Sequence, residues 1–364
     1  MNVLTVGGAM IDTIAIIESN RIELMKMRNA ETSFLLLEEG RKTEALEVST
    51  HCGGGAINAA VAMARLGGNV ATVAKLGRDV RAEMVLSRLI EENISAKWVV
   101  RDDTTPTGAS VIVSSHDRNA AIFTFRGANG LLQSNDLCDE AFAVDLVHVS
   151  SLSNASADRF PEVIGRAKAH GALVSANPGV RQLSARGSEF RNSLAKIDIL
   201  TLNRSEADVL VPNLVGARGK RGPEIAITGD SELPVLVRRG LTSGGHELGL
   251  GAFLENLVGL GPRHVVLTDG AAGAFVGTRD EILFCPAVPT KVVGTAGAGD
   301  AFAATFATQI ALGDDPAKAL VAASHNAAAV LAYVDTQSGL LHRESLDERL
   351  AAGSEPLDVR RWDL

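Results

Sequence analysis

The stretch Gly294-Thr295-Ala296-Gly297-Ala298-Gly299-Asp300-Ala301-Phe302 leads directly into a predicted helix, which extends from Gly299 to Leu312 and stops at Gly313. Its glycines let backbone N–H groups turn toward a common point, and the helix N-terminus adds its positive dipole end, so the segment can bind an anion. Asp300 could simply cap this helix. A carboxylate base beside an anion-binding loop is also the equipment for deprotonating an alcohol while a phosphoryl group is transferred to it.

A second glycine-rich segment, Cys52-Gly53-Gly54-Gly55-Ala56-Ile57-Asn58, opens another predicted helix that ends at Leu66. Three glycines allow a small polar ligand to lie against the backbone, and Asn58 can both donate to and accept from hydroxyl groups. The alternative is a tight strand–helix turn that binds nothing. Asp12 follows the first predicted strand by six residues, where it could accept hydrogen bonds from hydroxyls or lie solvated in a loop.

Short apolar strands alternate with helical segments along most of the chain. The predicted strands are residues 3–6, 146–149, 173–174, 197–200 and 265–267. This alternation favours an α/β fold with a mostly parallel sheet covered by helices on both faces. Ligands of such sheets bind beyond the carboxyl ends of the strands, so the turns that follow the strands are where a site is expected.

Two segments interrupt the alternation, and each predicts a β-hairpin: residues 34–37 with 43–48, and residues 108–115 with 120–126. Strands outside the main sheet could form a small lid over the ligand site, at about 30–50 and 107–126. Residues 211–250, rich in Gly, Pro and charge, predict an irregular insertion. The expected organisation is one domain over residues 1–340, followed by a C-terminal tail over 341–364.

Composition argues against several classes of partner. The 364 residues carry 35 Lys and Arg against 43 Asp and Glu, with two Trp and one Tyr, so a nucleic acid is not expected. No apolar run approaches the ~20 residues of a membrane helix, and no basic leader precedes the first strand. The three cysteines, at 52, 138 and 285, are widely spaced, which is typical of reduced thiols in a cytoplasmic protein.

Several common catalytic motifs are missing from the sequence. There is no G-x-x-x-x-G-K-[ST] P-loop, no strand-linked G-x-G-x-x-G and no G-x-S-x-G elbow. The eight His residues occur singly, which argues against a zinc site. The sequence therefore predicts a protein that binds phosphate groups without a P-loop.

Five motifs occur in the order found in the ribokinase/PfkB family of carbohydrate kinases, and the sequence resembles that family from Val3 to about Gly339. They are Gly53-Gly54-x-x-x-Asn58 with Ala64-Arg65-Leu66-Gly67, Asn203-Arg204-Ser205-Glu206, Thr268-Asp269-Gly270-Ala271-Ala272-Gly273, Gly297-Ala298-Gly299-Asp300 and Asn326-Ala327-Ala328-Ala329. Each short motif is weak alone, but five in order leave little room for chance.

The resemblance implies a Rossmann-like α/β core with a small β-lid, and transfer of the ATP γ-phosphoryl group to a hydroxyl of a sugar or sugar derivative. Asp300 would be the base, and the amides of Gly297, Ala298 and Gly299 would form the anion hole. The acceptor hydroxyls would be held by Asp12, Gly53, Gly54 and Asn58. Asn203 and Glu206 would organise Mg²⁺ and phosphates through water, with no direct protein ligand to the metal. The nucleotide pocket would be lined by Thr268, Gly270, Gly273 and Asn326.

The sequence departs from the family pattern at two places. Family members commonly carry an Asp where this chain has Gly294, and that carboxylate helps to hold an activating monovalent cation. Its loss puts activation by K⁺ in question, although backbone carbonyls could still bind an ion. Ribokinase proper has a Glu after the central strand, whereas Ser150-Ser151-Leu152-Ser153 offers none, which argues against ribose as the acceptor.

Two other functions remain open at this point. A nucleoside kinase of the same fold would stack a base on aromatic residues, and the lid segments contain Phe34, Phe123 and Phe125. A sugar or nucleotide sensor without turnover would not need the intact Asp300. The exposed apolar edge at Phe34–Leu37 also leaves open a homodimer formed through the lid.

Overall fold

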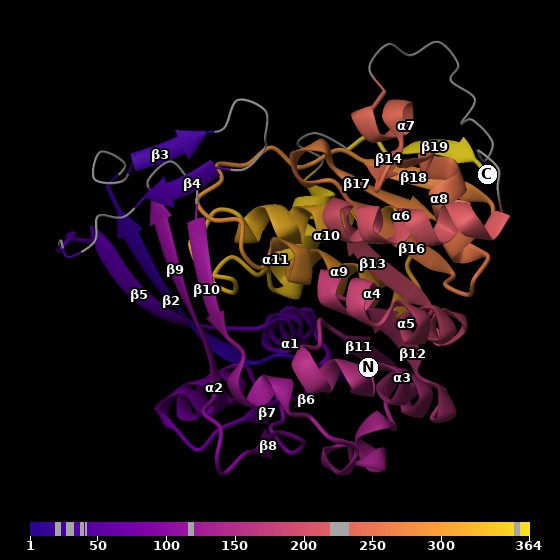
Figure 1. Ribbon diagram of the computed structural model, residues 1–364. Coiled ribbons are helices and arrows are strands. Elements are labelled where there is room, and N and C mark those ends of the chain that lie inside the picture. The colour runs from indigo at the N-terminus through magenta and orange to yellow at the C-terminus, as the bar shows by residue number, and fades with distance from the viewer. Residues whose placement is uncertain are drawn as a thin grey trace.

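The computed structural model describes residues 1–18, 23–26, 33–36, 40, 42–115, 120–218, 233–352 and 357–364. Within these residues the main body is built on one nine-stranded sheet (Figure 1). Its strand order is β19 (Arg360–Asp363), β18 (Glu281–Cys285), β17 (Ala274–Gly277), β16 (His264–Thr268), β13 (Ile199–Asn203), β12 (Leu173–Ala176), β11 (Leu146–Val149), β1 (Asn2–Val6) and β6 (Asn69–Val73).

The strands from β6 to β16 pair in parallel, and β17, β18 and β19 add an antiparallel edge. The central strands are apolar and almost completely buried, because helices cover both faces of the sheet. The α/β fold with a mostly parallel sheet is confirmed. The predicted strands coincide with β1, β11, β12, β13 and β16, although β13 begins at Ile199 rather than at Ile197.

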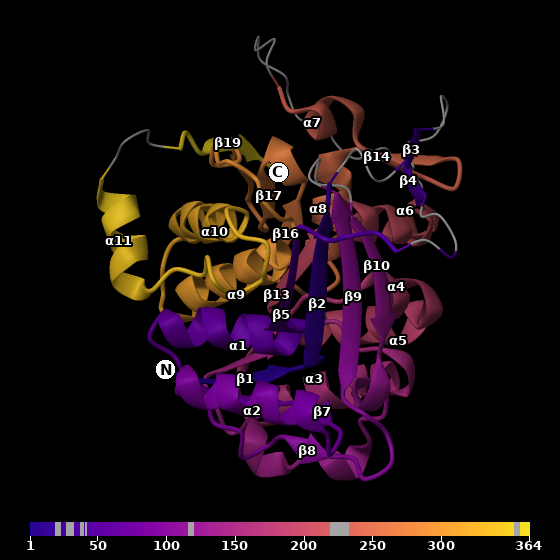
Figure 2. The same ribbon diagram turned by 90° about the vertical axis from the view of Figure 1, so that its left-hand side faces the viewer.

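One layer of helices packs against each face of the sheet (Figure 2). The first layer contains α1 (Gly55–Arg65), α2 (Val80–Glu91), α9 (Ala298–Ala311) and α10 (Pro316–Val330). The second contains α3 (Phe160–Ala169), α4 (Val180–Ala185), α5 (Gly187–Ser193), α6 (Arg204–Arg218) and α8 (Leu250–Val258). Residues 56–63 of α1 are all buried, and their many alanines let α9 approach closely.

A second, four-stranded sheet stands at the side of the main body (Figure 1), and we call it the lid. Its described strand order is β10 (Ala120–Phe125), β9 (Gly108–Ser115), β2 (Met10–Ile17) and β5 (Glu47–Gly53). β9 and β10 form the hairpin that the sequence predicts, with Ala109 opposite Phe125.

The other predicted hairpin is wrong in its pairing. β5 pairs with β2, and β4 (Ser33–Leu36) pairs with β3 (Glu23–Lys26). Residues 37–39 and 41, which include most of the expected turn, lie outside the described residues. The physical reason is that β2 enters the lid directly from β1 and supplies a partner for β5 on one side and for β9 on the other, a pairing that neighbouring residues do not encode.

Two segments expected to be irregular have regular structure. Within 211–250, α6 extends to Arg218, and the chain then resumes after the undescribed residues 219–232 with α7 (Val235–Arg239) and the hairpin of β14 (Leu241–Ser243) and β15 (His246–Leu248). The expected tail contains α11 (Arg343–Ala351) and β19, which completes the edge of the main sheet. Local composition could not reveal these pairings, since they depend on surfaces supplied by other elements.

Two further strands, β7 (Lys75–Leu76) and β8 (Val100–Arg101), form a short parallel pair. None of the helices in the described part of the chain has the length and apolar character needed to cross a membrane.

The position of β19 generates a stability prediction. Trp362 packs on the main core and its ring lies 6.4 Å from that of Phe284, so Trp362→Ala should lower the free energy of unfolding. Because Trp362 is only partly buried, we expect about 2 kcal/mol in a denaturant titration, less than for a fully buried aromatic residue. Asp363→Ala, on the exposed face of the same strand, is the control and should change stability by less than about 0.5 kcal/mol. Equal stability of both variants would contradict this prediction and would indicate that β19 is a dispensable tail.

Candidate active site

A cavity of about 230 Å³ lies between the lid and the carboxyl edge of the main sheet. The lid contributes Asp12, Ser110, Ile112, Ile122 and Thr124 to its wall. The two glycine-rich helix starts contribute Gly54, Gly55, Asn58, Gly297 and Asp300. The structure therefore brings together residues that are nearly 300 positions apart in the sequence.

The starts of α1 and α9 are shaped by glycines in conformations that other residues rarely adopt. Gly54, with φ +94°, precedes α1, and Gly297, with φ +80°, precedes α9. A Cβ on Gly54 would lie 2.5 Å from the carbonyl oxygen of Gly8, and one on Gly297 would lie 2.6 Å from Cβ of Thr336. Both turns therefore require glycine. At the start of α1 the N–H of Ala56 donates to the carbonyl of Gly8 at 3.1 Å, whereas the first amides of α9 have no backbone acceptor among the described residues and are available to a ligand.

Asp300 occupies the first turn of α9, but its side chain does not cap the helix. Its Oδ2 accepts a hydrogen bond of 2.8 Å from Nδ2 of Asn58 on α1. Burial raises the pKa of the Asp300 carboxyl, the hydrogen bond from Asn58 acts in the opposite direction, and the charge of Asp12 adds to the increase. The carboxylate thus faces the cavity as a stronger base than an ordinary aspartate.

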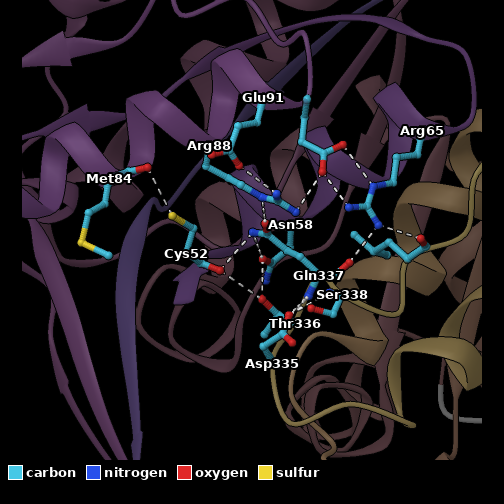
Figure 3. A network of polar contacts seen from close by, with 12 residues as sticks. Cys52, Asn58, Arg65, Met84, Arg88, Glu91, Asp335, Thr336, Gln337 and Ser338 are labelled. Atoms are coloured by element: carbon cyan, nitrogen blue, oxygen red, sulfur yellow. Dashed lines mark hydrogen bonds and ion pairs between the residues drawn. The ribbon is translucent and has the colours of Figure 1, made fainter. Parts of the chain in front are cut away.

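Asn58 is itself held by the segment that follows α10 (Figure 3). Its Oδ1 accepts hydrogen bonds from Thr336 Oγ1 at 2.8 Å and from Gln337 Nε2 at 3.0 Å. The Gln337 amide is fixed in turn, because its Oε1 accepts from Arg88 Nε at 2.9 Å. With its oxygen occupied by two donors, Asn58 must present its amide N–H groups to Asp300 and the cavity. Thr336 and Gln337 belong to no recognisable motif, so sequence analysis alone could not identify them.

Asp12 lies on β2 inside the lid, and its expected placement in a loop is wrong. It is 8% exposed, and the Ser110 hydroxyl donates to its Oδ1. Burial raises the pKa of the Asp12 carboxyl, while the hydrogen bond from Ser110 and the nearby His51 lower it. A Cβ on Gly53 would lie 2.0 Å from Oδ2 of Asp12, so the glycine makes room for this carboxylate.

Asn203 and Thr268 face each other in register at the carboxyl ends of β13 and β16. The Asn203 side chain accepts from the backbone N–H of Glu206 at 3.0 Å, and Glu206 accepts from that of Asn203 at 2.9 Å. The N-x-x-E motif thus stabilises the start of α6. Burial raises the pKa of Glu206 to about 7, the hydrogen bonds from Asn203 lower it, and the charge of Asp300 raises it, so the two carboxyl groups repel each other.

A divalent cation bound near these two carboxyl groups would reduce their mutual repulsion. No described group of three or more His, Cys, Asp or Glu side chains is arranged to hold a metal directly. A hydrated Mg²⁺, bound through water near Glu206, fits a site with two buried carboxyl groups of raised pKa.

The remaining residues expected around a nucleotide differ in their surroundings. Gly270, with φ +55°, faces open space in the turn after β16, whereas a Cβ on Gly273 would lie 2.3 Å from the carbonyl oxygen of Cys285. Asn326 is fully buried, donates to Thr305 Oγ1 at 2.8 Å and accepts from the backbone N–H of Leu341 at 2.9 Å. In this arrangement the Asn326 amide joins α9 to α10 through both of its polar ends, and its expected place beside a nucleotide stays a prediction.

The loop before α9 has no space for the carboxylate that is common in the family that the sequence resembles. A Cβ on Gly294 would lie 2.7 Å from the carbonyl oxygen of Tyr333, so an Asp would require the backbone to shift. This loop also bounds an apolar space of about 760 Å³ under the lid, with Ile14, Ile16, Ile112 and Ile122 on its other side. Ile112, Ile122 and Ala296 line both this space and the smaller cavity, so the two adjoin.

Comparisons with known proteins agree with this geometry. The family model for pfkB family carbohydrate kinases matches residues 22–343. A deoxyribokinase of Salmonella typhimurium is 26% identical over 339 residues, which cover 93% of this chain and 98% of the relative.

Solved structures show the same fold. A ribokinase of Arabidopsis thaliana, solved with ribose and ATP, aligns with a TM-score of 0.70 at 20% identity, over 96% of this chain and 98% of that one. A nucleoside kinase of Burkholderia thailandensis, solved with inosine, aligns with a TM-score of 0.69 at 20% identity, over 97% and 98%. The chain belongs to the pfkB family of carbohydrate kinases, and it is a sugar or nucleoside kinase with the ribokinase-like fold.

Proposed function

We propose that this protein transfers the γ-phosphoryl group of ATP to a hydroxyl of a sugar or sugar derivative bound in the cavity under the lid. The observation that carries the proposal is the position of Asp300. Its carboxylate faces the cavity from the start of α9, is oriented by Asn58 and has a raised pKa. A base and an anion-binding helix start therefore converge on one small space that Asp12 also lines.

Each residue has a distinct part in the proposed reaction. Asp12 and the free amide N–H of Asn58 bind and orient acceptor hydroxyls, while Asp300 takes the proton of the reacting hydroxyl. The N–H groups of Gly297, Ala298 and Gly299 stabilise the negative charge of the phosphoryl group as it is transferred. Mg²⁺, held through water by Asn203 and Glu206, would neutralise phosphate charge, and Thr268, Gly270 and Gly273 would border the nucleotide.

A nucleoside kinase is the second candidate, because the apolar space next to the cavity could hold a base. Aromatic stacking from the lid does not support it. Ile122 and Thr124 of β10 line the cavity, so the alternation of a strand places Phe123 and Phe125 on the opposite face. A sugar without a base is therefore the preferred acceptor.

The outer face of the lid is apolar and exposed. Val48, Val111, Phe123 and Phe125 are 63%, 46%, 60% and 52% exposed. The strand register places Thr13, Val111 and Phe123 side by side across this face. We propose that a second copy of the chain covers it, since a sheet face of this character is otherwise prone to aggregate.

Asp300→Asn tests the base. The amide keeps the size of the side chain but cannot take the proton, so turnover should fall by ~10²–10⁴-fold in an ADP-release assay. Because Asp300 does not cap α9, the free energy of unfolding should change by less than about 1 kcal/mol. Asp280→Asn, in the exposed turn between β17 and β18, is the matched control and should keep full activity. Near-normal turnover by the Asp300 variant would rule out its role as base.

The pH profile tests the electrostatics of the same group. Asp300 accepts a proton only when ionised, and its pKa is raised, so kcat/KM should fall on acidification at a pH above the ordinary value of 3.8. Asn58→Ala removes a hydrogen bond to the ionised form, and the acid limb should therefore move to still higher pH. If Asn58 has only a packing role, the variant will lose stability while its acid limb stays in place.

Sedimentation tests the lid dimer. The wild type should be a dimer at micromolar concentration, and Phe123→Glu should dissociate it because it places a charge in the centre of the proposed interface. Leu312→Glu, at an exposed apolar position after α9, should leave the dimer intact. A monomeric wild type would contradict the proposal that a second copy of the chain covers the outer face of the lid.

A further inference from the structure

Arg126 lies in the wall of the acceptor cavity and has no counter-charge in the part of the chain that the structure describes. It follows β10 directly and is half-buried. Asp12 and Asp300 line the same cavity, yet the Arg126 side chain forms no ion pair or hydrogen bond with either or with any other described residue. Partly buried charges are normally paired, so this one needs an explanation.

The backbone holds Arg126 firmly in this place. Its carbonyl accepts from the N–H of Asn129 at 3.2 Å, and Asn129 in turn bridges to the N–H and carbonyl of Ala9 at 3.0 and 2.7 Å. The N–H of Ala128 donates to the carbonyl of Pro106 at 2.9 Å. Arg126 is therefore presented to the cavity from a rigid turn, which lowers the entropic cost of using it in binding.

A second arginine, Arg181, lies close to the first and likewise forms no ion pair or hydrogen bond with another described residue. It belongs to α4, whose preceding residue, Gly179, packs so tightly on the cavity residue Ser151 that a Cβ there would lie 2.5 Å from Ser151 Oγ. Burial lowers the pKa of the Arg126 guanidinium, and the charge of Arg181 lowers it further. The Arg126 side chain stays charged at neutral pH, since the guanidinium group is an extremely strong base.

Arg126 lines the substrate cavity and Arg181 lies close to it, and neither has an acidic partner among the described residues, so this part of the site lacks a negative charge. We propose that the acceptor supplies it: the sugar derivative carries an anionic group, a carboxylate or a phosphate monoester, which binds to Arg126 with the help of Arg181. This inference rests on the proposed function and specifies its substrate class. The carboxylates Asp12 and Asp300 handle hydroxyls, while the arginines hold the acidic end of the same molecule.

The test is a panel of acceptors with the full-length protein. Neutral pentoses and hexoses, sugar acids and sugar monophosphates are compared by ADP release at saturating ATP. One of the two anionic classes should have the highest kcat/KM, and the panel identifies whether it is the carboxylates or the phosphates. Arg126→Met should raise KM for that acceptor about 10- to 100-fold, the effect of losing charge-assisted hydrogen bonds, with kcat and the KM for ATP nearly unchanged.

Graded variants separate recognition from structure. Arg126→Lys should recover part of the affinity, because it keeps the charge but not the bidentate geometry. Arg181→Gln should raise KM less, since Arg181 is exposed. Arg279→Met is the matched control in the turn after β17, where Arg279 is exposed and has no ion pair or hydrogen bond with another described residue, and it should behave as the wild type.

Binding measured without ATP keeps the two proposals distinguishable. Calorimetry should detect an anionic sugar that binds the wild type and not Arg126→Met, even if turnover is absent. Absence of ADP release with every acceptor would contradict the kinase function, but not the anion site. A neutral sugar as best acceptor, with a KM that Arg126→Met leaves unchanged, would overturn the inference. So would an Arg126→Met variant that loses kcat equally on all acceptors, because Arg126 would then act on the transferred phosphoryl group.

Discussion

The hydrogen bond from Asn58 to Asp300 is the interaction on which the rest of the site depends. It joins the starts of α1 and α9, and so fixes the proposed base relative to the turn that borders the cavity. Thr336 and Gln337 occupy the Asn58 oxygen, and Arg88 orients Gln337, so this one contact is maintained by residues from four separate parts of the chain. A base positioned in this way loses little entropy when the acceptor binds.

The charged residues in and around the cavity favour two chemically different kinds of ligand group. Asp12, Asp300 and Glu206 are carboxyl groups with a pKa raised by burial, and the charge of Asp300 contributes to that of Glu206. Such groups favour the approach of protons, hydroxyls and a hydrated cation. Arg126 also lines the cavity, with Arg181 close to it, and these two cations favour an anion. The same space can therefore orient a polar molecule with two chemically different ends.

Much of the fold was predictable because it is encoded locally. Strands such as Leu146–Val149 are uniformly apolar, and the helices of α1 and α9 end at glycines, so periodicity and stop signals identify them. The lid was harder to predict. The hairpin of β9 and β10 joins neighbours in sequence, whereas β2 pairs with β5 across more than thirty residues, and β19 adds to an edge formed by β18. Pairing between distant segments leaves no local pattern.

The sequence by itself determined the α/β class, the two glycine-rich helix starts and Asp300 as the candidate base, because glycines at sharp turns and a carboxylate beside them are properties of short contiguous segments. Only the tertiary structure decided that Asp12 belongs to the lid, that Asn326 is buried and that Thr336 and Gln337 hold Asn58. It also revealed Arg126 in the cavity wall as a cation that no described residue pairs with. Burial, hydrogen-bond satisfaction and missing counter-charges are relations between residues that only folding brings together.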